Sequence, residues 1–335
     1  MIKIRNRNPK RVRWGVIGLG RFSETAILPA LQNVRKAKIA SVYSKNSLRA
    51  KNIADKFSVP FHTNDFAEFL KSDIDAVYIG SSNNDHYSQV LAAAAAGKHI
   101  LCDKPLALSS EQAEEMVAVC KKNNVQLAVN YIYRFHPLLE KAKELISKQT
   151  IGKIISISTN FNIHFPPDNN FRFSKELSGG GVMRDLATHM LDLMRFLYGE
   201  VEPVSCIMDN IIYRTEVEDF ASGQLKFNNG GYAYFCVSSN CLRALNRIEI
   251  VGNRGSISIE NLIGGRFSSA KMSILLEGEG KKVFRKRTNK LHIALKSFNN
   301  SFLRNTTPVV TGEDGLVNLL LLEKLEKYAA EKRVN

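Results

Sequence analysis

One short segment carries an aspartate, a histidine and a second aspartate at helical spacing. Asp185, His189 and Asp192 follow the glycines at 179–181 and lie four and three residues apart, so a helix places all three side chains on one face. A carboxylate that accepts a hydrogen bond from one imidazole nitrogen fixes the tautomer and leaves the other nitrogen to exchange a proton. The segment therefore predicts proton transfer at His189, oriented by Asp185, beside a glycine run that admits a substrate.

The same residues allow other interpretations. Asp185 could bind a substrate hydroxyl directly, and His189 could be an ordinary core histidine. For Asp192 we favour a position that caps the helix or is solvated. Two carboxylates and a histidine could also bind a metal ion, but no second histidine lies at helical ligand spacing, so we predict no metal site.

A glycine pattern predicts a second site, near the start of the chain. Gly18 and Gly20 follow a short apolar segment and precede a helical pattern that begins with Arg21 and Phe22. Such a turn from strand to helix is where the pyrophosphate of a dinucleotide binds, because one glycine permits the tight turn and another lets the backbone approach the phosphates. Ser23 stands at the third glycine position.

The elements that must position these residues alternate between strand and helix over residues 11–130. We expect strands at 11–20, 38–44, 74–82, 99–105 and 125–131, with helices at 21–34, 46–57, 86–98 and 109–124. Strands that alternate with helices of this length indicate a parallel sheet wound on both faces. The fold class is therefore α/β, with a dinucleotide-binding Rossmann domain at 11–130 that follows a basic tail at 1–10.

The end of the second strand indicates which dinucleotide binds. Ser44, Lys45 and Arg49 lie there, and no carboxylate of this segment would repel the 2′-phosphate of NADP. We therefore favour NADP(H), with NAD(H) as the alternative, since Lys45 and Arg49 could also be a solvated helix face.

The pattern changes after residue 130. An amphipathic helix at 136–150 precedes strands at 153–165, 202–213, 219–239, 246–260 and 272–286, and a closing helix spans 312–333. Successive strands without intervening helices indicate a largely antiparallel sheet. Residues 131–335 are therefore predicted to form an α+β domain with an open-faced sheet.

Several motifs together resemble one family. "GVIGLGRF", "DAVYIGSSNNDHYSQVLAAAAAGKHILCDKPLALS", "YRFHP", "GKI" and "GGGVMRDLATHMLD" occur in this order, as they do in the Gfo/Idh/MocA oxidoreductases, the family of glucose-fructose oxidoreductase and inositol dehydrogenase. The segment "FRFSKELSGGG" resembles the branch that includes 1,5-anhydrofructose reductase and the sugar and dihydrodiol dehydrogenases.

The resemblance implies roles for further residues. It makes Lys104 the active-site lysine beside the nicotinamide, preceded here by Asp103 where the family usually has glutamate. It places the segment from Ser81 and Asn83 to His86 near the dinucleotide. It also directs Asn130, Phe171 and Arg172 toward the nicotinamide end of the cofactor, and it implies a homodimer or homotetramer formed through the open sheet of the second domain.

Composition narrows the class of protein. The chain has 335 residues, of which 44% are hydrophobic, and no apolar run is long enough to span a membrane. Its formal charge of +15 is spread along the chain instead of being gathered with aromatic residues, so we expect no nucleic-acid partner. Five cysteines without a CxxC pair argue against a disulfide framework, and we expect a cytoplasmic protein.

These residues and the resemblance together predict an NADP(H)-dependent oxidoreductase that interconverts a carbonyl and a secondary alcohol; the resemblance implies a sugar, a sugar derivative or a cyclic polyol as the substrate. A ketone that receives hydride develops negative charge on oxygen, so the site needs a cation and a proton donor. Lys104 and His189 supply both, and either could be the main donor. The alternative is a regulatory protein of the same fold that senses a dinucleotide without catalysis.

Overall fold

A computed structural model describes residues 11–244, 246–263 and 269–331 of the chain. The predicted basic tail at 1–10 lies outside the described residues. The described chain forms two compact units, and each is assembled from separate stretches. Unit one contains residues 11–106, 111–130 and 291–315, and unit two contains 107–110, the described part of 131–290 and 316–331.

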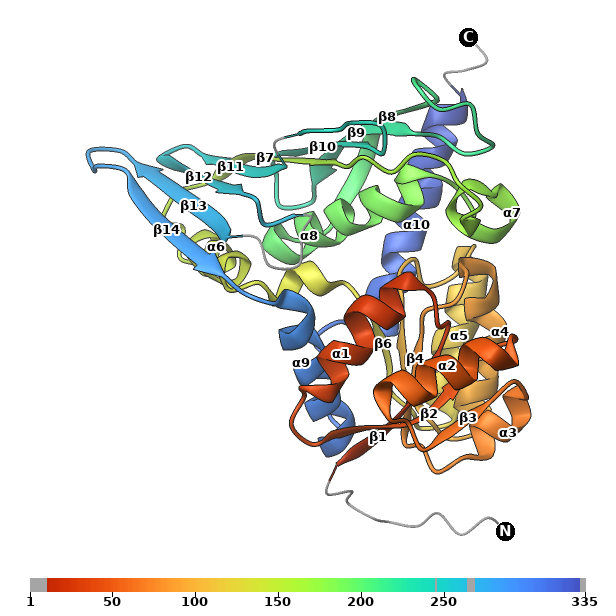
Figure 1. The fold of residues 1–335 in the computed structure, drawn as a ribbon. Helices are drawn as coiled ribbons and strands as arrows, with labels where there is room; N and C mark the ends of the chain where they lie inside the picture. The colour runs from red at the N-terminus through yellow and green to blue at the C-terminus, as the bar shows by residue number, and fades with distance from the viewer. Residues whose placement is uncertain (1–10, 245, 264–268, 332–335) are drawn as a thin grey trace. The chain divides into compact units, whose positions relative to one another are not determined.

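Unit one is built on a parallel sheet of six strands (Figure 1). Its strands are β1 (Val12–Ile17), β2 (Ala37–Tyr43), β3 (Phe61–Thr63), β4 (Ala76–Ile79), β5 (His99–Cys102) and β6 (Leu127–Val129). The order β3-β2-β1-β4-β5-β6 is that of a dinucleotide-binding fold. The predicted parallel Rossmann sheet is therefore confirmed, although the sequence argument missed the short strand β3.

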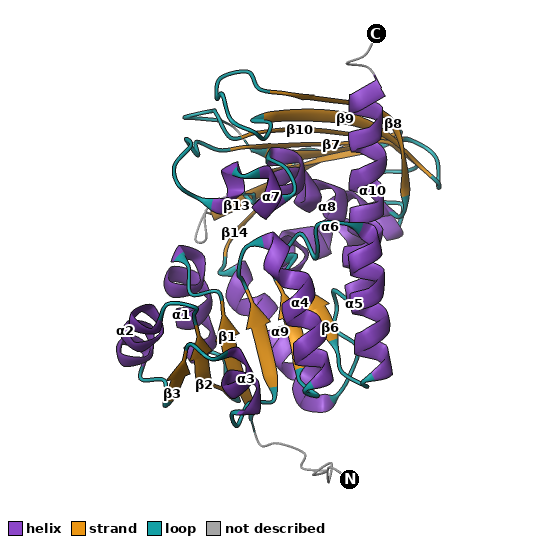
Figure 2. Ribbon diagram, turned by 90° about the vertical axis from the view of Figure 1, so that its right-hand side faces the viewer, coloured by secondary structure: helices purple, strands orange, loops and turns teal. Residues whose placement is uncertain are grey.

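Helices lie on both faces of this sheet (Figure 2). They are η1 (Ser23–Ile27, a π-helical turn), α1 (Leu28–Gln32), α2 (Ser47–Phe57), α3 (Phe66–Lys71), α4 (Asn83–Ala95), α5 (Ser110–Lys122) and α9 (Lys290–Arg304). Side chains at two helix starts explain why they begin there: Asn46 accepts a hydrogen bond from the Arg49 amide, and Asp65 accepts one from the Glu68 amide.

Helix α9 is a part of unit one that the sequence argument did not predict. The fully buried Trp14 of β1 donates its indole N–H to Asn299 over 3.0 Å, and its ring contacts Phe302 at a centroid distance of 5.5 Å. Phe302 also stacks on His99 of β5. A helix from near the chain's end thus covers the first and fifth strands.

Unit two contains a sheet of eight strands in the order β14-β13-β12-β11-β7-β10-β9-β8. The strands are β7 (Ile154–Asn162), β8 (Val201–Asp209), β9 (Phe220–Phe227), β10 (Tyr232–Ser238), β11 (Arg247–Gly252), β12 (Gly255–Glu260), β13 (Ser269–Leu276) and β14 (Lys282–Arg287). Among these described strands, β10 and β7 pair in parallel and the other neighbours are antiparallel, which confirms the predicted largely antiparallel sheet.

Helices cover one face of this second sheet (Figure 1). They are η2 (Ile132–Phe135), α6 (Pro137–Ser147), η3 (Phe171–Phe173), α7 (Lys175–Ser178), η4 (Met183–Ala187), α8 (Thr188–Tyr198) and most of α10 (Gly312–Glu331). In β10, Ala233 and Phe235 point into the core, whereas Tyr232 and Tyr234 are 43% and 37% exposed. The alternation exposes side chains on the outer face of the sheet, which no described helix covers.

Candidate active site

The first glycine turn closes tightly against a neighbouring loop. Gly18 has a φ of +77°, and a side-chain carbon there would lie 2.3 Å from the backbone of Gly80 and Ser81, so only glycine fits. A side-chain carbon at Gly20, by contrast, would meet nothing within 4 Å. Ser23 donates its hydroxyl to the Gly18 carbonyl over 2.6 Å. The turn is thus fixed at one glycine and open at the other, as an approaching phosphate requires.

The cations after β2 have acidic partners that the sequence argument overlooked. Lys45 lies 3.2 Å from Asp85 at the start of α4, and Arg49 contacts the Glu24 carboxylate at 2.7 Å. Lys56 and Arg49 lower the pKa of Glu24 to about 2. The segment itself contains no carboxylate, but the fold brings carboxylates from two other elements to these cations.

The carboxyl ends of β5 and β6 meet at the side chain of Asp103. This carboxylate accepts hydrogen bonds from the Lys104 amide at 3.0 Å, the Asn130 amide group at 3.3 Å and the Tyr78 hydroxyl at 3.3 Å. The other amide atom of Asn130, its oxygen, is buried and has no hydrogen-bond partner in the described structure. Asp103 thus ties the backbone before Lys104 to β4 and β6.

His86 holds the same segment through a hydrogen bond to its backbone. Its ring is fully buried, and Nδ1 lies 3.0 Å from the Pro105 carbonyl, which follows a cis Lys104-Pro105 peptide bond. Because a carbonyl only accepts, Nδ1 carries the proton, and burial lowers the pKa of the ring. The structure shows a buried ring that bonds the Pro105 carbonyl, and the position of His86 near the dinucleotide stays a prediction.

The loop before α4 is also well packed. Ser81 donates its hydroxyl to the Gln89 side chain over 2.7 Å, and Asn83 is 8% exposed. Both residues follow β4, which is the neighbour of β1 in the sheet. The loop after β4 therefore lies beside the glycine turn.

In unit two, the helix with Asp185 begins differently from the prediction. Residues Met183–Ala187 form a π-helical turn before α8 starts at Thr188, so the simple α-helical spacing from Asp185 to His189 does not hold. Asp185 lies 3.4 Å from the guanidinium of Arg172, which in turn rests 4.7 Å over the Phe171 ring. The structure therefore brings Phe171, Arg172 and Asp185 together. π-Helical turns of this kind are frequent at functional sites.

His189 lies against aromatic rings and is 9% exposed. Its ring meets Tyr133 edge-on at a centroid distance of 4.8 Å and Tyr131 at 5.9 Å. The hydroxyl of Tyr131 is in turn 2.7 Å from that of Thr188. These contacts restrict the orientation of the imidazole.

Asp192 is an ion-pair partner inside unit two. Asp192 is 1% exposed and accepts a hydrogen bond from Nε of Arg134 over 2.9 Å. The side chain of Arg134 is itself only 7% exposed. Asn318 of α10 also donates to Asp192, over 3.4 Å. The prediction of a capping or solvated position is wrong. Its spacing along the helix directs the side chain into the core, where the charge needs a cation.

The glycine run is packed against protein. A side-chain carbon at Gly181 would lie 2.0 Å from the backbone oxygen of Glu218. The Glu218 carboxylate accepts from the Gly181 and Met183 amides at 3.0 and 2.9 Å, so it caps the π turn, and burial raises its pKa. We expected these glycines to make room for a substrate. At Gly181, the space that the missing side chain leaves is occupied by Glu218.

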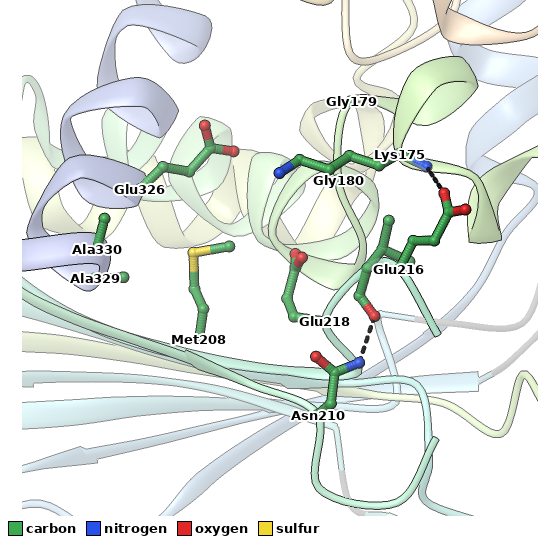
Figure 3. A pocket seen from close by; sticks show the side chains of 11 residues that line it. Lys175, Gly179, Gly180, Met208, Asn210, Glu216, Glu218, Glu326, Ala329 and Ala330 are labelled. Carbon is green, nitrogen blue, oxygen red and sulfur yellow. Dashed lines mark hydrogen bonds between the residues drawn. The ribbon is translucent and has the colours of Figure 1, made fainter. Parts of the chain in front are cut away.

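A cavity of about 280 Å³ lies within unit two and is lined in part by Gly179 and Gly180 (Figure 3). Its described lining consists of Lys175, Gly179, Gly180, Met208, Asn210, Glu216, Val217, Glu218, Glu326, Ala329 and Ala330. Asp185 and His189 are not part of that lining. The described residues contain no group of three or more histidine, cysteine or acidic side chains arranged to hold a metal ion.

The predicted site residues thus fall into two sets. Unit one holds the glycine turn, the cations after β2 and the Lys104 segment, whereas unit two holds Phe171, Arg172, Asp185 and His189. The sequence argument did not name Tyr78, Tyr131, Tyr133 or Glu218. Tyr78 and Tyr133 lie in quoted motifs and Tyr131 comes two residues before one, but nothing in a single sequence tells which aromatic ring faces a histidine. No helix in the described ranges is long and apolar enough to cross a membrane.

Comparisons with known proteins match both parts of the chain to one family. Residues 12–131 match the model of an oxidoreductase family with an NAD-binding Rossmann fold, Gfo/Idh/MocA, and residues 139–258 match the C-terminal domain of the same family. The chain is 30% identical to myo-inositol 2-dehydrogenase of Thermotoga maritima, over 96% of this chain and 97% of that protein.

Two further proteins are similar over nearly the whole chain. 1,5-Anhydro-D-fructose reductase of Ensifer adhaerens is 28% identical over 95% of this chain and 96% of its own length. The structure of the aldose-aldose oxidoreductase of Caulobacter crescentus, complexed with glycerol, superposes with a TM-score of 0.87 at 26% identity and covers 96% of this chain and 98% of that one. With both of its domains matched, this chain belongs to the Gfo/Idh/MocA family of oxidoreductases.

Proposed function

We propose that this oxidoreductase uses NADP(H) to interconvert a carbonyl and a secondary alcohol on a sugar, a sugar derivative or a cyclic polyol. One observation carries the proposal: the glycine turn, the Ser81 loop, Lys104 and Asn130 all follow the carboxyl ends of adjacent parallel strands. Ligands of such sheets bind at that edge. The names of the inositol dehydrogenase and the anhydrofructose reductase support the substrate class.

The residues of unit one fit a dinucleotide. The empty space at Gly20 would receive the pyrophosphate, together with the first amides of the helix at Arg21 and Phe22. The buried Asn130 oxygen without a partner suits the carboxamide N–H of a nicotinamide. When bound, the dinucleotide supplies or accepts the hydride.

The protein's own groups handle the charge and the proton. The Lys104 ammonium would polarise the reacting oxygen, since Asp103 and His86 fix the backbone on both sides of it. His189 would exchange the proton with the substrate. Asp185, paired with Arg172, would orient the imidazole or bind a substrate hydroxyl.

Titration of the protein with NADPH and NADH tests the cofactor. Ser44, Lys45 and Arg49 would bind the 2′-phosphate, so Lys45→Ala and Arg49→Ala should weaken NADPH binding at least tenfold and leave NADH binding within twofold. Calorimetry on protein freed of carried-over cofactor measures both affinities. Lys51→Ala is the matched control, because Lys51 lies on the same helix and pairs with Asp55.

The outcomes separate the parts of the proposal. A clear preference of the wild type for NADH would overturn the NADP assignment and leave the oxidoreductase intact. Binding of neither dinucleotide would remove the basis of the mechanism.

We further propose that the chain forms a homodimer or homotetramer through the outer face of the unit two sheet. Support comes from the exposed apolar side chains on its strands, among them Val204, Ile207, Tyr232 and Tyr234. Exposed apolar side chains gathered on one face of a sheet are typical of a surface that binds another protein.

A further inference from the structure

Asp103 and Asn130 are close in space because two neighbouring strands of unit one end beside each other. β5 ends at Cys102 and β6 ends at Val129, and these two residues are partners in the parallel pairing. The backbone N–H of Asn130 donates to the Cys102 carbonyl over 2.9 Å. Asp103 and Asn130 therefore lie together at the carboxyl edge of the sheet, where ligands of parallel sheets bind.

The contact between the two side chains has one chemically possible orientation. The side-chain nitrogen of Asn130 lies 3.3 Å from Oδ1 of Asp103. A carboxylate only accepts hydrogen bonds, whereas a side-chain amide donates through its nitrogen and accepts through its oxygen. The nitrogen of Asn130 must therefore face Asp103, and the amide oxygen is turned to the other side.

Two further hydrogen bonds hold the Asp103 carboxylate in place. Oδ1 also accepts from the backbone N–H of Lys104 over 3.0 Å, and Oδ2 accepts from the hydroxyl of Tyr78 in β4 over 3.3 Å. The carboxylate is thus tied to β4, to the end of β5 and to the end of β6. A group that is already fixed loses little freedom when it binds a partner, so it orients the Asn130 amide firmly.

The amide oxygen of Asn130 is the acceptor that remains. It is buried, and no residue in the described part of the chain donates to it. Because a buried acceptor without a donor is costly, such an atom at a ligand-binding edge indicates a donor on the ligand. The carboxamide of a nicotinamide carries an N–H of this kind.

We propose that Asp103 is a positioning residue that turns the oxygen of the Asn130 amide toward the nicotinamide, so that this oxygen accepts the carboxamide N–H. The inference rests on the proposed function, since it needs a dinucleotide at this edge of the sheet. Without the carboxylate, the Asn130 amide can turn over and present its nitrogen, which cannot accept an N–H. Asp103 thus selects ligands that carry a donor at this position.

Two ligands that differ in one group test the inference without turnover. The acetylpyridine analogue of NADP⁺ has a methyl ketone in place of the carboxamide, so it keeps the carbonyl and lacks the N–H. The wild type should bind NADP⁺ about tenfold more tightly than this analogue. Calorimetry on cofactor-free protein measures both affinities, and NAD⁺ with its own analogue replaces the pair if the wild type prefers NAD⁺.

Variants of the two residues should change this ratio of affinities. Asp103→Ala and Asn130→Ala should each lower the ratio to about one, because no oriented acceptor remains for the carboxamide N–H. Asp103→Asn keeps an acceptor oxygen for the Asn130 nitrogen and should retain the ratio. A general disturbance of the Lys104 backbone would weaken both ligands alike and leave the ratio unchanged. Asp103→Leu, similar in shape to aspartate but without an acceptor, replaces the alanine variant if that variant unfolds.

Tyr78→Phe is the matched control. It removes a different donor to the same carboxylate and leaves the contact between Oδ1 and Asn130, so it should keep the wild-type ratio within about twofold. In ligand-free protein, the NMR signals of the Asn130 side-chain NH₂ are identified by their loss in Asn130→Ala. They should move upfield in Asp103→Ala, because the hydrogen bond to the carboxylate is lost.

The results distinguish this inference from the proposed function. Equal affinities of a tightly binding wild type for NADP⁺ and the analogue would refute the role of Asp103 and leave the proposed function intact. A full ratio in the folded alanine or leucine variant, or an equal loss in Tyr78→Phe, would refute it as well. A wild type that binds no dinucleotide would refute the proposed function and, with it, the ligand assigned to Asn130.

Discussion

The two residues proposed to handle charge and proton are held in different ways. The segment of Lys104 is fixed through its backbone, by the Asp103 carboxylate on one side and by His86 on the Pro105 carbonyl on the other. His189 is fixed through its ring, which contacts Tyr131 and Tyr133. Both arrangements restrict the position of a functional group, and such preorganisation lowers the cost of reaching the transition state.

Replacement of either group should reduce catalysis more than binding. We expect Lys104→Ala and His189→Ala each to lower kcat by on the order of a hundredfold, because each removes a charge or proton exchange partner from the reacting oxygen. Dissociation constants for the dinucleotide should stay within about threefold of the wild type. Steady-state kinetics and calorimetry on the same preparations measure both.

Surface residues of the same types are the controls for this prediction. Lys51→Ala and His62→Ala alter exposed side chains and should retain full activity. Wild-type kcat in either active-site variant, with the fold intact by circular dichroism, would exclude that residue from the chemistry.

At the scale of elements, helix α6 begins at a histidine whose ionisation is coupled to folding. The His136 ring accepts a hydrogen bond from the Leu138 amide over 3.2 Å, and the residue is 2% exposed. Burial, with Lys290 and Lys286 nearby, lowers its pKa to about 4. A protonated ring would lose its acceptor at the helix start and place a charge in the core.

The direction of the pH effect follows from this shift. The unfolded chain binds a proton at His136 near pH 6.5, whereas the folded chain resists it down to about pH 4, so stability from the neutral ring is full above pH 6.5 and is lost as the pH falls toward 4. The loss should be on the order of 2 to 3 kcal/mol.

Urea unfolding between pH 7.5 and 4.5 measures this loss. His136→Asn supplies a helix cap that does not titrate, so its free energy of unfolding should decline less steeply than that of the wild type. His62→Asn, an exposed control, should follow the wild type. Parallel slopes for the wild type and His136→Asn would contradict the assignment.

Elements were predicted from sequence where the pattern is local and missed where it is not. The glycine turn and the five long strand patterns of unit one each carry their signal within a few residues. β3 has three residues, too few for a period to be read, and α9 was missed although its apolar residues repeat. The buried pairs were missed for another reason: Arg134 and Asp192 lie 58 residues apart, and only the fold brings them together.

At the scale of the whole molecule, the outer face of the unit two sheet should control assembly. We expect the wild type to have a mass that is a multiple of the 37.5 kDa chain. Ile207→Asp and Tyr234→Asp place charges among exposed apolar side chains and should yield monomers, because a buried, unpaired charge costs several kcal/mol. Size-exclusion chromatography with light scattering measures the masses.

The control for this prediction is an exposed leucine outside the strands. Leu242 is 78% exposed, and Leu242→Asp should leave the mass of the assembly unchanged. A monomeric wild type would contradict the proposed assembly, and an oligomer that persists in both strand variants would show that another surface is used.

The packing of α9 on Trp14 determines when the core of unit one can be completed during translation. The Trp14 indole donates to Asn299, 285 residues further along the chain, so the first strand of unit one stays partly bare until residue 299 has left the ribosome. At about 5 to 20 residues per second, that interval lasts roughly 15 to 60 s. Chaperones that bind apolar segments therefore have an opportunity to act on the nascent sheet of unit one, and the emergence of α9 completes its core.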